Sequence, residues 1–239
     1  MGYLAGERQR RERRSGFHPE GVSGVSDPAE ERRALKDRIL EAALMHAAFD
    51  GWGGHTLANA AADAGIDSAT ARRLFPRGGD SLLDWLDDWA DRRMRERVAG
   101  ENLEALPVGR RIALLVRARF EALAPHREAV RRAVLAHGLP HNLPGGVAAL
   151  WRTVDRIWEA AGFPAGDRRT LDHYTRRALL AGILLATLFY WLEDQSEGCR
   201  ETWAFLDRRI AEVLRYGRLS GRLRDFLRAV PRGGRRRAP

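Results

Sequence analysis

Hydrophobic side chains recur along most of this chain at intervals of three or four residues, which is the spacing of one face of an α-helix. The alternation of β-branched residues that marks strands is nearly absent, and glycine and proline cluster between the periodic segments. The pattern therefore predicts an all-α protein with about nine to ten helices. The longer predicted helices span residues 28–50, about 80–98, 108–124, 126–138, 145–162, 168–193 and 199–216, with a last candidate at 217–230.

The N-terminal part of the chain carries clear helix boundary signals. The segment Asp27–Glu30 combines an N-cap, a first-turn proline and a capping-box glutamate, and Gly51 should end the helix. Thr56 and Asp67 are expected to cap two short helices, the second of which ends at Phe75. The spacing of these two helices resembles the helix-turn-helix opening of TetR-type regulators.

The most apolar segment lies toward the C-terminus. From Ala178 to Leu192 no charged residue appears, and this run of fifteen is shorter than the ~20 residues needed to cross a bilayer. A buried helix is therefore predicted, in which Ala178, Gly182 and Ala186 form a small-residue stripe that lets another backbone or a flat ligand approach. After a break at Glu193–Gly198, one face of a second, amphipathic helix holds Trp203, Leu206, Ile210 and Val213.

This region carries a resemblance to a known family. The block Tyr174–Gly182 reads YTRRALLAG and the block Glu201–Ile210 reads ETWAFLDRRI, and together they resemble the Coq-nine family of ubiquinone-biosynthesis accessory proteins. Weaker agreement extends back to the Phe75-Pro76 region, so the resemblance covers roughly residues 30–215. The chain departs from the family at His173, where a Trp usually stands, and in the loop Ser196–Cys199, which lacks the usual proline.

The resemblance implies a TetR-like helical bundle whose interior binds an isoprenoid lipid and which forms a homodimer through its last two helices. With the two tails, which lie outside the resemblance and are inferred from their composition, the expected organisation is a disordered basic tail (1–28), a helix-turn-helix-like subdomain (29–78), a lipid-binding and dimerisation domain (79–216) and a basic amphipathic tail (217–239). Family members present quinone intermediates to a separate di-iron demethoxyubiquinone hydroxylase, so the chain is expected to be a non-catalytic accessory protein. No metal or cofactor is expected. The expected location is cytoplasmic, peripheral on the inner face of the bacterial membrane, in preference to the mitochondrial matrix.

Three sets of site residues are predicted. The lipid cavity is expected between the helices at 108–124, 145–162 and 168–193, where large apolar side chains accompany a small glycine. The start of the last of these helices resembles the family's hydroxylase-binding patch, and an apolar stripe surrounded by arginines in the C-terminal tail is typical of an interfacial membrane helix. The sets are Phe120, Trp151, Trp158, Leu180, Gly182, Leu184 and Phe189 for the lipid; His173, Tyr174 and Arg177 for the hydroxylase; and Arg218, Leu219, Arg222, Leu223, Phe226, Leu227 and Val230 for the membrane surface.

The net charge of +9 raises an alternative, a DNA-binding regulator of the TetR type. Residues 1–16 hold five arginines against two glutamates and residues 215–239 hold nine arginines against one aspartate, which leaves the body slightly negative. The predicted recognition helix would offer Arg72 and Arg73, but Asp63 and Asp67 lie beside them, so little counterion release is expected. We therefore expect no nucleic-acid partner.

A second alternative is a prenyl-transferring enzyme. The sequence Asp87-Asp88-Trp89-Ala90-Asp91 matches the DDxxD pattern with which prenyl-diphosphate synthases hold magnesium. A solvated helix face is the favoured interpretation, because Asp88 with Arg92 and Asp91 with Arg95 would form i, i+4 ion pairs and no second aspartate-rich motif exists.

Overall fold

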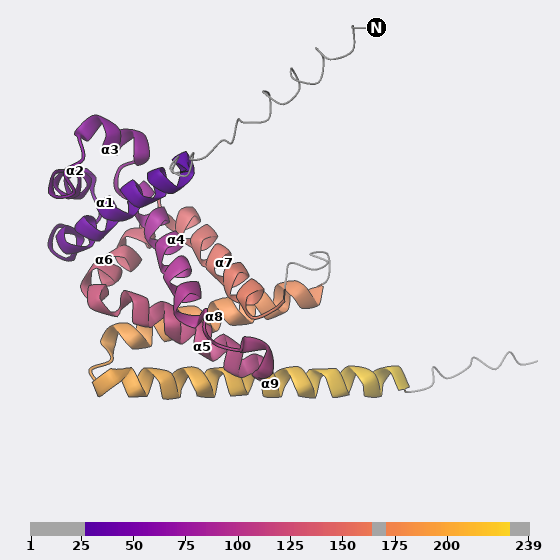
Figure 1. Cartoon of the computed structure of the whole chain (residues 1–239). Coiled ribbons are helices and arrows are strands. Elements are labelled where there is room, and N and C mark those ends of the chain that lie inside the picture. Colours follow the sequence, from indigo (N-terminus) through magenta and orange to yellow (C-terminus); the bar gives the residue numbers. More distant parts are fainter. Residues whose placement is uncertain (1–26, 164–170, 230–239) are drawn as a thin grey trace, which may run out of the picture. The chain divides into compact units, whose positions relative to one another are not determined.

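The computed structural model describes residues 27–163 and 171–229, and the chain divides into two compact units, 1–35 and 36–239. The side chains of 171–173 and 216–229 are not described. Over the described ranges every regular element is helical, which confirms the all-α prediction (Figure 1). The α-helices are α1 (Pro28–Asp50), α2 (Gly54–Asp63), α3 (Ser68–Leu74), α4 (Gly79–Val98), α5 (Val108–Leu123), α6 (Arg127–His137), α7 (Leu143–Ala160), α8 (Leu171–Glu193) and α9 (Arg200–Ala229).

The predicted start and end of α1 are confirmed. Within the first unit, the backbone N–H of Ala29 donates to Asp27 Oδ1 at 3.0 Å, so Asp27 satisfies one of the free amides at the helix start. At the other end Gly51 has φ of +75°, a left-handed conformation that glycine adopts without strain and that stops the helix. The predicted boundary of the N-terminal tail at residue 28 remains a prediction.

The two short helices form as predicted, with one correction. Asp67 caps α3 by accepting the Thr70 N–H at 2.9 Å. Thr56 does not cap α2, because that helix already begins at Gly54 and the Thr56 side chain is buried within it. The Thr56 hydroxyl instead donates to the Gly51 carbonyl at 2.6 Å, which secures the turn between α1 and α2.

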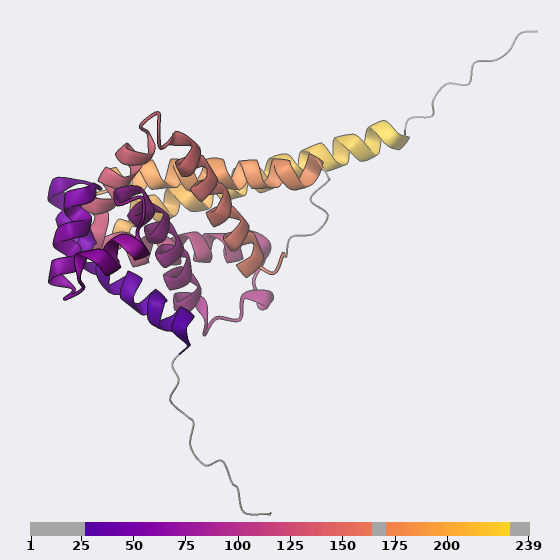
Figure 2. The same ribbon diagram turned by 90° about the horizontal axis from the view of Figure 1, so that it is seen from above.

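The second unit is built around α4 and α5, which pack against each other along their length. Helix α7 packs on both of them and on α8, while α9 packs on α5 and α8 (Figures 1 and 2). Gly109 allows the close approach of α5 to α9, because a side chain there would meet Leu214 Cδ1 at 2.8 Å. The bundle core includes Met94 of α4, Leu115 of α5, Ile157 of α7 and Trp191 of α8.

A short turn joins α8 to α9 and holds a buried carboxylate. Asp194 accepts hydrogen bonds from the backbone N–H groups of Ser196 at 2.8 Å and Thr202 at 2.9 Å, and from the Thr202 hydroxyl. Burial raises the pKa of Asp194, but these hydrogen bonds outweigh it and hold the pKa well below its ordinary value. The turn therefore depends on an ionised Asp194.

Helix α9 corrects the predicted break at 216–217. It continues without interruption to Ala229, and its C-terminal half extends past the N-terminal end of α8 in both views (Figures 1 and 2). Gly217 and Gly221 both lie in this part of the helix, and each costs it only about 1 kcal/mol, so they weaken the helix without ending it. The predicted membrane-binding residues from Arg218 to Leu227 thus lie on α9, although their side chains are not described, and Val230 lies outside the described residues.

The most apolar helix, α8, is half covered. Its stretch Tyr174–Glu193 is long and apolar enough to cross a membrane by length and composition alone, with a mean hydropathy of 1.2, and 44% of that window is buried. A core helix passes the same test, and α8 packs on α7 and α9.

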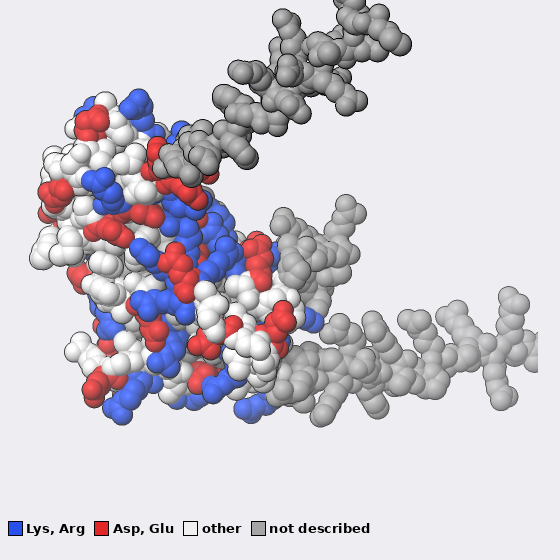
Figure 3. All heavy atoms as spheres, in the orientation of Figure 1, with Lys and Arg blue, Asp and Glu red and all other residues white. Residues whose placement is uncertain are grey.

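Basic and acidic side chains are intermingled on the face shown in Figure 3, so that described face offers no uniformly basic area.

Candidate ligand cavity

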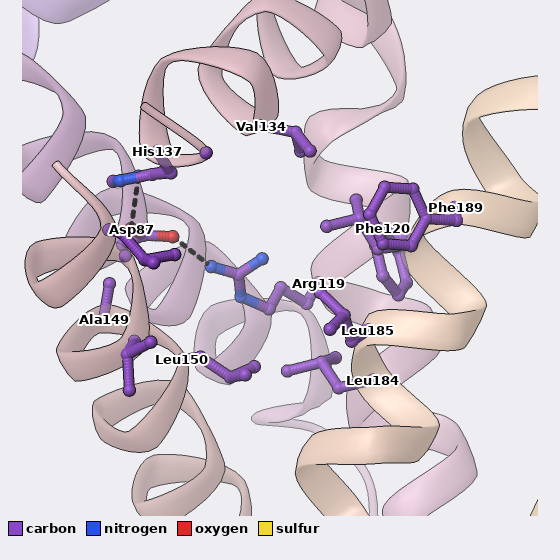
Figure 4. Close-up of a pocket in the computed structure, with 15 residues that line it drawn as sticks. Asp87, Arg119, Phe120, Val134, His137, Ala149, Leu150, Leu184, Leu185 and Phe189 are labelled. Atoms are coloured by element: carbon purple, nitrogen blue, oxygen red, sulfur yellow. Dashed lines mark hydrogen bonds and ion pairs between the residues drawn. The ribbon is translucent and has the colours of Figure 1, made fainter. Parts of the chain in front are cut away.

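A cavity of about 290 Å³ opens between α5, α6, α7 and α8, with α4 contributing at one end (Figure 4). Its walls are almost entirely apolar. Helix α8 contributes Leu184, Leu185, Leu188 and Phe189, and Phe120 of α5 closes one side, stacked in a tilted contact on the buried Trp191 at 5.3 Å between ring centroids. Leu185 and Phe189 are 40% and 52% exposed, so they mark the open side of the cavity.

Small residues on α7 make room for this cavity. Ala149 lines it and is buried, and Gly146 lies against the side chain of His137 at the end of α6. A Cβ at Gly146 would come within 3.0 Å of His137 Cβ, closer than side chains normally pack. Gly146 therefore allows His137 to reach the cavity wall.

The polar groups of the cavity gather at one end, where α4, α5 and α6 meet. The guanidinium of Arg119 donates from Nη2 to Asp87 Oδ1 at 2.9 Å, and His137 Nε2 lies 3.6 Å from Asp87 Oδ2 (Figure 4). Burial raises the pKa of Asp87, but His137 and Arg119 outweigh it, so the net shift is downward and the group is ionised at neutral pH. The cavity thus joins a long apolar wall to a charged end.

A network of ion pairs lies behind that end. Arg119 Nε donates to Asp91 Oδ1 at 2.8 Å, and Arg156 bridges Asp91 Oδ2 at 3.1 Å and Asp88 Oδ1 at 2.7 Å. The Thr153 hydroxyl lies 3.2 Å from Asp91 Oδ2. Because removing one member of such a network leaves a buried charge unpaired, it fixes how α4, α5 and α7 sit against one another.

This network corrects the interpretation of the DDxxD sequence as a solvated face. Asp91 is 2% exposed and pairs with Arg119 and Arg156, whereas the predicted partner Arg95 contacts Glu159 at 3.3 Å. Of the two predicted i, i+4 pairs only Asp88 with Arg92 forms, at 3.0 Å. The carboxylates are taken up by arginines, and no group of carboxylate, His or Cys side chains in the described part of the chain could hold a metal ion.

The predicted lipid residues divide into two groups. Phe120, Leu184 and Phe189 line the cavity. Gly182 is not among the residues that line it; it is exposed one turn before Leu185 on α8, with open space where a Cβ would point. Leu180 is buried one turn before Leu184. Trp151 lies on the outer face of α7, and Trp158 contacts Phe163 edge-on at 5.4 Å near the end of that helix.

The predicted hydroxylase patch is likewise split. Tyr174 is 55% exposed on α8, but Arg177 is buried and forms an ion pair with Asp155 of α7. The side chain of His173 is not described.

Sequence reasoning missed Asp87, Arg119 and His137 as cavity residues. One signal could have found Arg119. It occupies a position on the apolar face of α5 that follows Ile112 by seven residues and Leu115 by four, where a hydrophobic residue is expected. A charge in the middle of a buried helix face indicates a paired or functional group.

The chain is similar in sequence to a known protein family and to several of its members. A family model described as COQ9 matches residues 143–217. The human ubiquinone biosynthesis protein COQ9, mitochondrial, is 29% identical over 210 residues, which cover 85% of this chain and 65% of that protein. COQ9-B of Xenopus laevis is 30% identical over 199 residues, covering 80% of this chain and 67% of that protein. The chain thus spans slightly less than two thirds of the length of the human relative.

The fold also matches a solved structure, the crystal structure of a TetR transcriptional regulator from Nitrosomonas europaea. The TM-score is 0.61 at 29% sequence identity, over 75% of this chain and 97% of that chain. This confirms the predicted TetR-like all-α fold. The identity to the Xenopus protein across two thirds of its length, together with the family match, shows that the chain belongs to the COQ9 family of ubiquinone biosynthesis proteins.

Proposed function

We propose that this protein is a non-catalytic carrier that holds an isoprenoid quinone intermediate in the α5–α8 cavity and presents it to a demethoxyubiquinone hydroxylase. The cavity is the observation that supports this most directly. Its walls are apolar along α7 and α8, and its open side is bordered by half-exposed apolar side chains. Exposed apolar surface of this kind marks a binding site rather than an ordinary protein surface.

The size of the cavity fits part of such a lipid. At about 290 Å³ it lies at the lower end of small-molecule sites, so it holds the head and the first part of a tail. The rest of a long isoprenoid would leave by the open side of the cavity, past Leu185 and Phe189 of α8. Leu143 and Val147 of α7 also line the cavity and are 53% and 47% exposed, so they add apolar surface for the lipid.

The remaining parts of the proposal rest on the family and the chain's own surfaces. Tyr174 is the exposed aromatic residue proposed to contact the hydroxylase, and the exposed stripe of α8 is proposed to contact a second copy. The C-terminal tail is proposed to rest on an anionic membrane surface, with the protein on the cytoplasmic side.

The lipid proposal is tested by filling the cavity. Ala149→Leu adds the same atoms as Ala148→Leu on the neighbouring position of α7, but Ala149 lines the cavity and Ala148 is exposed outside it. Native mass spectrometry of the purified proteins should find co-purified lipid on the wild type and on Ala148→Leu, and little on a folded Ala149→Leu. Overpacking costs about 1–3 kcal/mol, so circular dichroism must show that Ala149→Leu remains helical. Equal lipid recovery from all three proteins would contradict the cavity assignment.

DNA binding remains the second candidate, because the solved structural neighbour is a transcriptional regulator and Arg72 and Arg73 are exposed on α3. Its test is a salt-dependent gel shift on genomic fragments, compared between wild type and an Arg72→Ala, Arg73→Ala variant. A sequence-specific shift lost in the variant would favour this function over the carrier.

A further inference from the structure

The charged end of the cavity has no role in holding an isoprenoid tail. A hydrocarbon gains nothing from contact with Asp87, Arg119 or His137, and burying such groups is costly unless they are paired. Yet α4, α5 and α6 each direct one of these side chains to the same place, next to apolar walls (Figure 4). This arrangement indicates that the end recognises the polar part of the ligand.

One nitrogen of the Arg119 guanidinium, Nη1, is not engaged by the described side chains around it. Its Nε is used by Asp91 and its Nη2 by Asp87, whereas among the described residues Nη1 has no hydrogen-bond partner. In Figure 4 one terminal nitrogen of the guanidinium reaches Asp87 and the other is turned away from it. Nη1 is not sealed off from solvent, and the residue lines the cavity. The two N–H groups on Nη1 are therefore available to an acceptor atom on a ligand.

The charge at this end decides which acceptor fits. Arg119 faces two carboxylates, Asp87 and Asp91, and Arg156 behind it is shared between Asp88 and Asp91. Each described arginine at this end is thus already matched by carboxylates. No surplus positive charge remains for a carboxylate or phosphate head, and Asp87 would repel one at close range. A neutral oxygen can accept from Arg119 without that repulsion.

We propose that Asp87, Arg119 and His137 form a recognition site for a neutral, oxygen-bearing head group such as a phenol hydroxyl or a quinone carbonyl. The ring enters first and its oxygen accepts from Arg119 Nη1, while the apolar tail leaves past Leu185 and Phe189. A phenol hydroxyl also donates to Asp87. This inference rests on the proposed lipid-carrying function and specifies which class of lipid the cavity selects.

The test compares three farnesyl-derived probes with different heads: a farnesylphenol, farnesylbenzene and farnesoic acid, in which a carboxylate takes the place of the ring. Each displaces the neutral fluorescent dye N-phenyl-1-naphthylamine from the full-length protein, and the midpoint of displacement gives the relative affinity. A hydrogen bond to a charged donor corresponds to about a tenfold gain. The phenol should therefore bind about tenfold more tightly than farnesylbenzene, and farnesoic acid no more tightly than farnesylbenzene.

Two substitutions locate the effect. Arg119→Lys keeps a positive charge opposite the aspartates but loses the planar second nitrogen, so the phenol and farnesylbenzene should differ by less than about threefold. Asp87→Asn removes the repelling charge while keeping the side-chain shape, so farnesoic acid should gain about tenfold relative to wild type. Asp84→Asn, one turn away on the same helix and outside the cavity, is the control and should leave all three affinities unchanged.

The outcomes separate this inference from the proposed function. Displacement of the dye by none of the three probes would overturn the carrier function itself. Equal displacement by the phenol and farnesylbenzene on the wild-type protein would leave lipid binding intact and overturn the recognition site, whether or not the variants fold. Tightest binding by farnesoic acid would also overturn it.

Discussion

Arg177 on α8 holds its guanidinium nitrogen Nη2 2.7 Å from Asp155 Oδ1 on α7, and the Arg177 side chain is only 10% exposed. This ion pair joins the helices that carry two walls of the cavity. It also sets Arg177 apart from Tyr174, one turn earlier, which is more than half exposed. Within the block that resembles the family's hydroxylase-binding patch, one residue therefore braces the fold and the other lies at the surface.

Replacing Arg177 should destabilise the fold. Arg177→Ala leaves Asp155 unpaired, and because Asp155 is about a third exposed, we expect a loss of about 1–3 kcal/mol in the free energy of unfolding rather than the larger cost of a fully buried pair. Urea unfolding followed by circular dichroism measures this. Arg208→Ala, an exposed arginine on α9, should change the same quantity by less than about 0.5 kcal/mol. Equal stabilities of the two variants would show that the ion pair contributes nothing.

Replacing Tyr174 should weaken partner binding. An aromatic anchor at an interface is commonly worth about 2 kcal/mol, so Tyr174→Ala should weaken capture of the cognate hydroxylase by at least about tenfold. A pull-down with graded hydroxylase concentrations measures it, with Arg208→Ala as the surface control. Unchanged capture by the folded Tyr174→Ala protein means that the contact lies elsewhere.

The buried carboxylate between α8 and α9 makes stability depend on pH. The pKa of Asp194 is depressed in the folded protein, so its contribution is fully present above the ordinary value near 3.8 and is lost as the pH falls toward the folded pKa. Asp194→Asn should lower the free energy of unfolding by about 1–3 kcal/mol at pH 7. Between pH 7 and pH 3 the difference in the free energy of unfolding between wild type and Asp194→Asn should decrease by about 1 kcal/mol, because only the wild type takes up a proton at residue 194 on unfolding. If urea titrations give the same difference in the free energy of unfolding at both pH values, stability is not linked to the ionisation of Asp194.

Substitution of Gly182 should act on self-association. The glycine lies on the exposed face of α8 with open space around it, so Gly182→Leu should fold and retain its cavity ligand. If the small-residue stripe packs against a second copy, the added side chain separates the two backbones. Sedimentation velocity should then show a dissociation constant raised at least about tenfold, while Ala148→Leu leaves it unchanged. A Gly182→Leu protein that associates like the wild type would exclude this face from the dimer.

The C-terminal part of α9 should bind anionic membranes. We expect the full-length protein to float with anionic liposomes. A chain truncated after Tyr216 should not float, because the deletion removes the apolar stripe and most of the basic residues of the C-terminal tail. A variant with serine at Leu219, Leu223 and Phe226 keeps the arginines and should float weakly, more so at low salt. Equal flotation of full-length and truncated chains would refute the assignment.

The local signals in the sequence are sufficient for most helix boundaries. Asp67 and Gly51 act through neighbouring backbone groups, so their effect can be predicted without knowledge of the tertiary fold. The prediction that Thr56 caps α2 is wrong because its hydroxyl bonds back across the α1–α2 turn. The predicted division into helices at 199–216 and 217–230 is wrong because Gly217 and Gly221 weaken α9 without ending it.

The candidate site could be predicted only in part. Phe120, Leu184 and Phe189 were found because apolar periodicity identifies the inner face of a helix. The ion pairs of Asp87 and Arg119 join residues 32 positions apart on different helices, and no local pattern reveals that partnership. Gly182 illustrates a second limit. A small residue on a helix indicates that something can pack closely against it, but the sequence does not tell whether this is a ligand in the cavity or another protein molecule.

The Asp194 turn has a consequence for how the chain folds. The backbone N–H groups that bind this carboxylate lie within eight residues of it, so the α8–α9 hairpin closes a very short loop. Pairings of such low contact order form early, whereas the packing of α7 on α4 joins segments that lie much further apart in the chain. During refolding the hairpin should therefore exist for a time with Leu180 and Leu184 uncovered. We expect this transient apolar surface to be where the chain is most prone to aggregate before α7 arrives.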